Sequence, residues 1–253
     1  MESLSSVKID LSGRIALVTG GTRGIGKAIV QLFFDAGATV IVTGTKTDEI
    51  ESLKKNNVSD RMHYFQVDFS SESSITDFLQ YINKLEAIDI LVNNAGVNRI
   101  NLNTETSDED YDFLTSINLK APYMICREVS KVMKRNNYGR IVNITSIWST
   151  ITRPGRSLYA LTKTGIVGLT KTLSVELAEY NIMVNAVGPG FTMTELTATT
   201  NTVEEIEKIS SIIPVKRMAQ PVEIANLVSF LCSDLNSYLT GQNIIIDGGY
   251  TNV

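Results

Sequence analysis

The sequence predicts one α/β domain, residues 1–253, built on a doubly wound sheet of about seven parallel strands with helices on both faces. Short runs rich in β-branched residues alternate with longer amphipathic stretches, and a glycine-rich turn follows the first run. No proline- or serine-rich linker and no internal repeat divides the chain. A chain of 253 residues can therefore form one domain around one large core.

Each β-branched run is short and largely apolar, which is typical of a buried parallel strand. The seven predicted strands are 14–19, 38–44, 62–68, 88–93, 139–145, 182–188 and 243–248. Helical spacing predicts helices between them at 25–36, 48–55, 72–85, 108–136, 158–179 and 221–233. Several of these begin with a capping residue, such as Ser107 followed by Asp110.

The segment from 189 to 220 fits neither period as a whole. A connection of this length in a compact domain is usually functional, so residues 191–220 are predicted to form a lid over the substrate site. Helical spacing within 203–213 predicts one helix there, which Pro214 is expected to end.

The composition excludes several classes of function. The net charge is −4 and the cations are scattered, so no nucleic-acid partner is expected. No signal peptide or apolar span is evident, which predicts a cytoplasmic protein without membrane association. Cys126 and Cys232 lie in apolar contexts and are expected to be buried thiols. His63 is the only histidine, so neither a histidine-based metal site nor a Ser-His-Asp hydrolase is expected.

A glycine-rich turn joins the first strand to the first helix, as in dinucleotide-binding Rossmann folds. Gly20 permits the tight turn, Gly24 lets the backbone approach a pyrophosphate, and Gly26 lets the helix pack on the strand. The helix dipole favours an anion at this position. The predicted cofactor-binding residues of the turn are Gly20, Thr22, Arg23, Gly24, Ile25 and Gly26.

The end of the second strand discriminates between NAD and NADP, because an acidic side chain there binds the ribose 2′-hydroxyl and repels a 2′-phosphate. No acid occurs before Asp48. Arg23 and Lys46 can instead meet a 2′-phosphate, to which Thr43 and Thr45 can donate hydrogen bonds. The sequence therefore predicts NADP(H) in preference to NAD(H).

Tyr159 and Lys163 lie four residues apart in a predicted helix, so their side chains share one face. An ammonium beside a phenol lowers the phenol's pKa, which suits Tyr159 to proton transfer. Ser146 ends the fifth strand, at the edge where open α/β sheets gather reacting groups, and can donate to a substrate oxygen.

These motifs together resemble the short-chain dehydrogenase/reductase family, in order and over most of the chain. The resemblance rests on the glycine pattern from Thr19 to Gly26, Asn93-Asn94-Ala95-Gly96, Asn118, Ser146, Tyr159 with Lys163, and Pro189-Gly190. It implies hydride transfer at the nicotinamide while Tyr159 gives its proton to a carbonyl oxygen that Ser146 polarises. It further implies that Lys163 holds the nicotinamide ribose and that Asn118 keeps a water linking that lysine to solvent.

The resemblance also implies further cofactor contacts. Asp68 is placed near the adenine amino group, although an N-cap role for the next helix is an alternative. The small residues from Asn93 through Ala95 to Gly96 leave room for the adenosine half. The nicotinamide side is assigned to Pro189, Gly190, Thr192 near the carboxamide and Thr194 near the pyrophosphate.

Two classes of enzyme are consistent with these motifs, and they differ in substrate, which is a small-molecule carbonyl or an acyl thioester. One is a 3-oxoacyl-(acyl-carrier-protein) reductase and the other a sugar, polyol or other small-ketone dehydrogenase. Carrier-protein reductases usually offer basic docking residues at two places that hold Asn137 and Tyr180 here, although Lys134 and Arg135 lie nearby.

Three residues near the predicted site are candidates for substrate contact. Arg153 and Arg156 can clamp an anionic substrate or be exposed loop arginines. Trp148, the only tryptophan, can wall the substrate pocket or pack in the core.

A different class, a catalytically silent dinucleotide sensor, is a remote alternative that the intact Ser146, Tyr159 and Lys163 disfavour. By resemblance, the chain is expected to form a homotetramer through helices 108–136 and 158–179.

Overall fold

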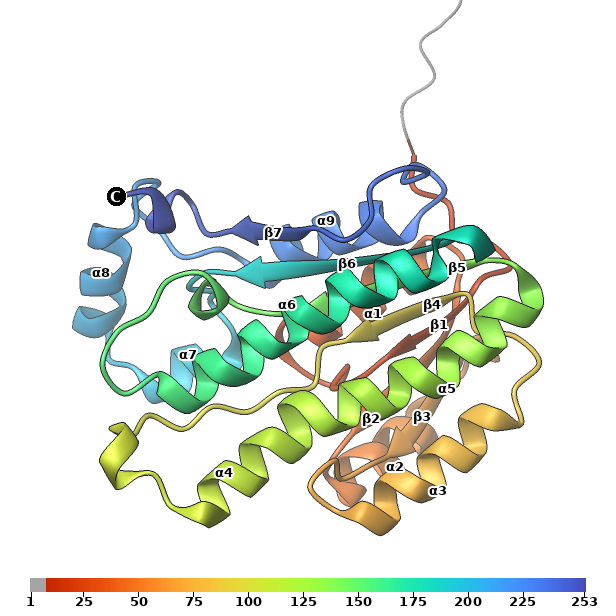
Figure 1. Ribbon diagram of the computed structural model, residues 1–253, viewed down its shortest axis with the longest axis horizontal. Coiled ribbons are helices and arrows are strands. Elements are labelled where there is room, and N and C mark those ends of the chain that lie inside the picture. Colours follow the sequence, from red (N-terminus) through yellow and green to blue (C-terminus); the bar gives the residue numbers. More distant parts are fainter. Residues whose placement is uncertain (1–7) are drawn as a thin grey trace, which may run out of the picture.

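The computed structural model describes residues 8–253, so the first seven residues of the predicted domain lie outside the described part. One parallel sheet of seven strands has the order β3-β2-β1-β4-β5-β6-β7, which confirms the doubly wound α/β fold (Figure 1). The strands are β1 Ile15–Val18, β2 Thr39–Gly44, β3 Met62–Gln66, β4 Ile90–Asn93, β5 Gly139–Ile144, β6 Ile182–Pro189 and β7 Asn243–Ile246.

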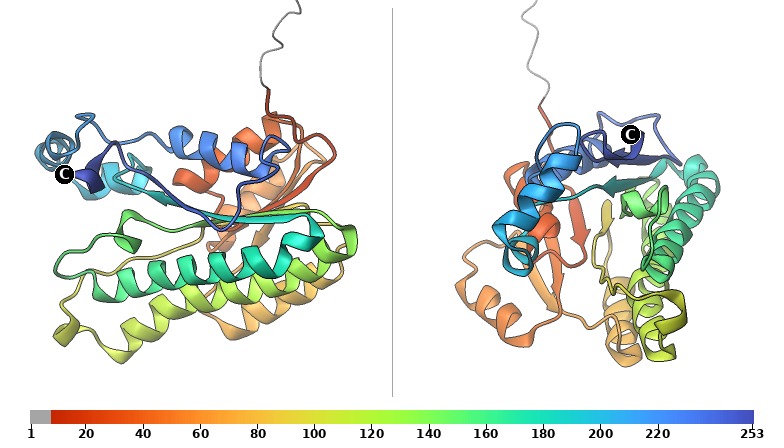
Figure 2. Two further views of the ribbon diagram at one scale, coloured as in Figure 1. Left: turned by 45° about the horizontal axis from the view of Figure 1, so that its top comes forward. Right: turned by 90° about the vertical axis from the view of Figure 1, so that its left-hand side faces the viewer.

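Helices cover both faces of this sheet, as Figure 2 shows. They are α1 Gly24–Asp35, α2 Thr47–Asn56, α3 Glu72–Asn83, α4 Asp108–Thr115, α5 Ala121–Asn136, α6 Ser157–Leu177, α7 Glu195–Thr200, α8 Val203–Ile212 and α9 Pro221–Cys232. Side chains of α3 and α5, among them Phe78 and Val129, form the core on one face. Side chains of α1 and α9, such as Phe33 and Val228, form the core on the other face.

Residues 108–136 are helical throughout, as predicted, but the helix contains a π-helical turn that the sequence did not indicate. A π-helical turn at Ser116–Lys120 separates α4 from α5. Such a turn inserts extra backbone without changing the apolar spacing enough to be visible in the sequence, and π-turns often occur at functional sites. Asn118 lies in this turn.

The predicted lid contains more regular structure than its sequence indicates. The predicted helix is present as α8, and Thr202 and Glu205 form a reciprocal capping box at its start. The six-residue helix α7 was not predicted. A single bridge pairs Thr192 with Ala219, so the two ends of the segment lie together.

All seven strands are parallel, so their carboxyl ends lie along one edge of the sheet. In Figure 1 the arrowheads of β6 and β7 point to the side where α7, α8 and the C-terminus gather. No helix among residues 8–253 combines the length and apolar character needed to cross a bilayer. Over the same range, no cluster of three or more His, Cys, Asp or Glu side chains suits a metal ion.

Candidate active site

The glycine turn between β1 and α1 has the geometry of an anion cradle. Gly20 and Gly24 have φ values of +62° and +56°, which L side chains rarely adopt. A side chain at Gly26 would collide with the Gly20 carbonyl oxygen and approach the Asn94 amide to 2.5 Å. Arg23 is the N-cap of α1 and makes no side-chain capping bond, so the first amides of the helix are not satisfied by its side chain. These features fit a dinucleotide pyrophosphate.

Two residues that sequence reasoning did not select hold this turn in place. The Thr19 hydroxyl accepts hydrogen bonds from the amides of Asn94 and Ala95, each at 3.0 Å. The Asn94 side chain donates to the carbonyls of Thr19 and Gly20 at 3.0 and 2.9 Å. Thr19 opens the glycine pattern and Asn94 lies in the Asn93–Gly96 motif. Their role depends on β1 and β4 being neighbours in the sheet.

Thr43 lies inside the protein beside the glycine turn, and its contact with a 2′-phosphate stays a prediction. Its side chain is 1% exposed, and its hydroxyl accepts a hydrogen bond from the Gly20 amide at 3.2 Å. Thr45, Lys46 and Arg23 are exposed. Lys46 is the N-cap of α2, as Arg23 is of α1. Neither cation makes an ion pair with any of residues 8–253.

The Asn93 side chain bonds to neighbouring elements of the fold. Its amide donates to the Asn143 side chain at 2.8 Å and contacts the Cys126 sulfur at 3.2 Å, inside the protein. It therefore braces β4 against β5, and its place beside the adenosine half stays a prediction. Ala95 is partly exposed and Gly96 exposed at the same strand end.

Asp68 follows β3 and is partly exposed. Its carboxylate accepts hydrogen bonds from the amide and the hydroxyl of Ser70, at 2.8 and 2.7 Å. The N-cap of α3 is Ser71, whose hydroxyl accepts from the Ser74 amide, so the alternative N-cap role for Asp68 is wrong. Asp68 stays a candidate for the adenine contact.

The segment after β6 lies against the glycine turn. A side chain at Gly190 would approach the Asp247 Cβ to 2.7 Å, so only glycine after Pro189 fits here. Thr194, the N-cap of α7, lies against Gly24, because a Cβ there would be 3.3 Å from its Cγ2. Thr192 is buried and donates to the Gly190 carbonyl at 3.2 Å. The segment after β6 and the glycine turn are therefore in direct contact.

Lys163 and Tyr159 lie on one face of α6, close to Ser146. The Lys163 Nζ donates to the Ile144 carbonyl at 2.9 Å and lies 5.6 Å from the centroid of the Tyr159 ring. Lys163 is 5% exposed and makes no ion pair within residues 8–253. Tyr159 is half-buried, and Ser146 is buried at the carboxyl end of β5. A phenol, a hydroxyl and an amine therefore meet at the edge of the sheet.

The pKa values in this cluster are set mainly by burial. Burial raises the pKa of the Tyr159 phenol, whereas a hydrogen bond with Ser146 and the charge of Arg156 lower it. Burial lowers the pKa of Lys163 to about 8. Arg156 is therefore a cation that acts on the phenol, and the tuning of Tyr159 by Lys163 stays a prediction.

Asn118 joins the π-helical turn to the site. Its side-chain oxygen accepts from the Val97 amide at 3.0 Å, and its amide donates to the Val97 carbonyl at 2.9 Å and to Thr162 at 3.2 Å. A side chain at Gly96 would lie 3.4 Å from both Asn118 and Lys163. Asn118 thus fixes the strand end beside the lysine.

The three substrate candidates lie together. Arg153 and Arg156 each place the guanidinium carbon 5.1 Å from the Trp148 ring centroid. Arg156 is buried, so the alternative of two exposed loop arginines is wrong for this residue, whereas Arg153 is exposed. Phe191 meets the Trp148 ring edge to face at 6.5 Å, and Tyr250 meets Phe191 at 5.1 Å. Sequence reasoning missed these two aromatic residues, which are distant from Trp148 in the chain.

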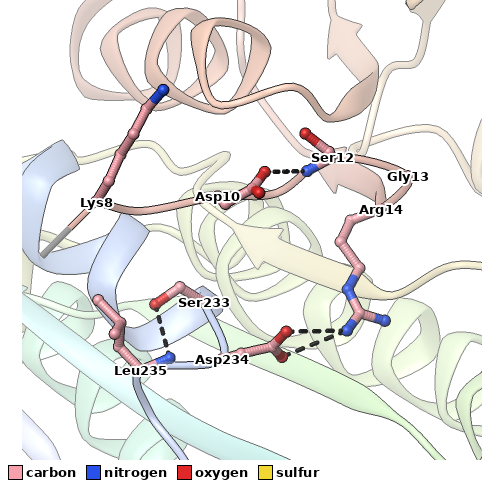
Figure 3. Close-up of a pocket in the computed structure, with 8 residues that line it drawn as sticks. All are labelled: Lys8, Asp10, Ser12, Gly13, Arg14, Ser233, Asp234 and Leu235. Carbon is pink, nitrogen blue, oxygen red and sulfur yellow. Dashed lines mark hydrogen bonds and ion pairs between the residues drawn. The ribbon is translucent and has the colours of Figure 1, made fainter. Parts of the chain in front are cut away.

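A separate hollow of about 360 Å³ lies at the opposite, amino edge of the sheet (Figure 3). Arg14 forms an ion pair there with Asp234 at 3.2 Å, and Tyr138 donates to the same carboxylate at 2.9 Å. Burial raises the pKa of Tyr138 to about 12. The charges of Arg14 and Asp234 neutralise one another. Their ion pair connects the start of β1 to the chain after α9.

The glycine cradle and the Ser146, Tyr159 and Lys163 cluster together define an oxidoreductase that acts on CH–OH or C=O groups. A family model described as "Enoyl-(Acyl carrier protein) reductase" matches residues 20–251. The chain belongs to the short-chain dehydrogenase/reductase family, in agreement with the resemblance of its motifs.

Individual relatives match almost the whole chain. The 3-oxoacyl-(acyl-carrier-protein) reductase FabG of Aquifex aeolicus is 40% identical over 248 residues, covering 96% of this chain and 99% of that protein. Nodulation protein G of Rhizobium sp. is 39% identical over 241 residues, covering 95% and 98%. The crystal structure of a gluconate 5-dehydrogenase from Burkholderia cenocepacia with NADP and tartrate has a TM-score of 0.87 and 27% identity, covering 97% of this chain and 98% of that one.

Proposed function

We propose that the protein interconverts a ketone and a secondary alcohol with NADP(H), and that Tyr159 is the general acid/base. The observation that carries this proposal is the convergence of Tyr159, Ser146 and Lys163 at the carboxyl edge of the sheet, beside the glycine cradle. When bound, the nicotinamide supplies or accepts the hydride.

The chain's own residues account for binding and proton transfer. Gly20, Gly24 and Gly26 allow a pyrophosphate to approach the N-terminus of α1. Ser146 donates to the substrate oxygen, and Tyr159 gives that oxygen its proton or removes it in the reverse direction. Lys163, held by the Ile144 carbonyl, is proposed to bind the nicotinamide ribose.

The preference for NADP(H) is proposed from the cations at two helix N-termini. Arg23 and Lys46 are exposed and make no ion pair within the described chain, and no acidic residue ends β2. A 2′-phosphate can accept hydrogen bonds from both cations. The Burkholderia cenocepacia structure, which carries NADP, supports the same assignment.

Two substrate classes are supported by different observations. The Aquifex aeolicus relative is a 3-oxoacyl-(acyl-carrier-protein) reductase by name, which favours an acyl thioester. Against this, Asn137 and Tyr180 stand where carrier-protein reductases usually have docking cations. One cation is nevertheless close by, because the Lys134 ammonium lies 4.1 Å from the Tyr180 ring centroid. The enclosed arginine beside Trp148 favours a small sugar-derived substrate instead.

Replacing Tyr159 tests the reaction. Oxidation of NADPH is followed against acetoacetyl thioesters, keto-sugars and simple ketones, and the preferred substrate is then given to Tyr159→Phe. We expect kcat to fall at least roughly 100-fold, the lower end of general acid–base contributions, with little change in NADPH binding. Full turnover by Tyr159→Phe would contradict the assignment. NADPH binding without turnover of any carbonyl would favour the dinucleotide-sensor alternative.

Replacing Lys46 tests the cofactor preference. We expect kcat/KM to be higher with NADPH than with NADH, and Lys46→Ala to reduce the NADPH value by roughly tenfold, the effect of one charge-assisted hydrogen bond. The NADH value should change little, because NADH lacks the 2′-phosphate. Lys55→Ala, at the far end of the same helix, is the control. A KM for NADH equal to or below that for NADPH would refute the preference.

Assembly into a homotetramer is proposed from the faces of α4, α5 and α6. Large side chains stand exposed there, including Tyr111, Tyr123, Leu161 and Val175. Gly165 and Leu119 line a shallow hollow between these helices, which a symmetry-related copy can fill. Light scattering should give four times the mass of the chain, and a monomer at micromolar concentration would contradict this assembly.

A further inference from the structure

Arg156 is a buried cation without a counter-ion. It is the N-cap of α6, its side chain is 6% exposed, and its Nε has no hydrogen-bond partner within residues 8–253. No carboxylate of the described chain lies within ion-pair distance of its guanidinium. Arginine is rarely buried without a partner, because removing its charge from water is costly.

The surroundings of Arg156 increase this cost. Arg153, a second cation, lies over the same Trp148 ring, and both guanidinium carbons are 5.1 Å from the ring centroid. Burial first, and the charge of Arg153 second, hold the pKa of Arg156 below its usual value. The π-face of Trp148 compensates part of a positive charge, but it cannot accept the directed hydrogen bonds of a guanidinium.

The position of Arg156 connects it to the reaction. It precedes Tyr159 by three residues in the loop and first turn after β5, and its charge acts on the Tyr159 phenol. An anion bound to Arg156 therefore lies close to a substrate oxygen that Tyr159 protonates. Trp148, Phe191 and Tyr250 form an aromatic wall on the same side.

We propose that the substrate carries a carboxylate, and that Arg156, assisted by Arg153, binds it and thereby selects keto or hydroxy acids over neutral ketones and thioesters. This proposal rests on the proposed function, because it places the carboxylate relative to a carbonyl at Tyr159. The planar fork of a guanidinium matches a carboxylate with two parallel hydrogen bonds. An acid supplies both the counter-charge and the acceptor that Arg156 lacks.

The test compares each acid with its own neutral ester. 4-Oxopentanoate and a six-carbon keto-sugar acid are assayed against their methyl esters with NADPH, and dihydroxyacetone phosphate is assayed as a phosphate-bearing ketone. The wild type should prefer at least one acid to its ester. Arg156→Gln should lower kcat/KM for that acid by roughly 10- to 100-fold more than for its ester, as loss of a charged hydrogen-bond pair predicts.

Two further variants give the test its controls. Lys84→Gln removes one exposed positive charge at the C-cap of α3 and should leave the ratio of acid to ester unchanged. Arg153→Gln, at an exposed position, should lower the ratio less than Arg156→Gln does. Because Arg156 is buried without a counter-ion, the melting temperature of Arg156→Gln should equal or exceed that of the wild type. Should Arg156→Gln fail to fold, the proposal is still overturned if the wild type prefers no acid to its ester or if Arg153→Gln leaves the acid-to-ester ratio unchanged.

Binding gives a readout that does not depend on turnover. Trp148 is the only tryptophan, and its ring lies against both arginines, so its emission reports on an acid bound there. Titration with the acids should change this emission with saturation in the wild type and not in Arg156→Gln. The inference is overturned if no acid is preferred to its ester, if the preference survives in Arg156→Gln, or if the phosphate is preferred. Failure of the proposed function differs, because then no ester is reduced and Tyr159→Phe changes nothing.

Discussion

The site depends on positive charge that is buried without acidic partners. Lys163 and Arg156 are both nearly inaccessible, and neither forms an ion pair within residues 8–253. Lys163 is held by a single backbone carbonyl and Arg156 by the face of Trp148. In a medium less polar than water such charges stabilise nearby anions more strongly. The anions that this edge is suited to meet are the phenolate of Tyr159 and a charged group on the substrate.

The fold places these groups through the order of the strands. β1, β4 and β5 are adjacent in a parallel sheet, so the glycine turn, Gly96 and Ser146 all leave from one edge. Hydrogen bonds between strand ends then fix the turn, as the side chains of Thr19 and Asn94 show. The π-helical turn at Asn118 brings a third side chain to the same edge, where it fixes Val97.

The strand and helix pattern was predictable because parallel strands buried on both faces form short apolar runs, whereas the helices between them have amphipathic spacing. Local spacing also identified the glycines of the cradle and the pair Tyr159 and Lys163. Ser146 could be selected because it directly follows a predicted strand. The hydrogen bonds of Thr43 and Asn93 could not be predicted, because their side chains turn to neighbouring segments that local sequence does not reveal. The contacts of Trp148 with Phe191, and through it with Tyr250, join segments that only the fold brings together.

The most direct test is the pH dependence of alcohol oxidation by the wild type and Arg156→Gln, using a neutral alcohol so that substrate charge does not contribute. In the proposed reaction oxidation requires the Tyr159 phenolate, so kcat/KM should rise with pH through the pKa of that phenol. Removing the positive charge of Arg156 disfavours phenolate and raises this pKa, so the midpoint should move to higher pH in the variant. A midpoint that stays in place in Arg156→Gln would contradict the account.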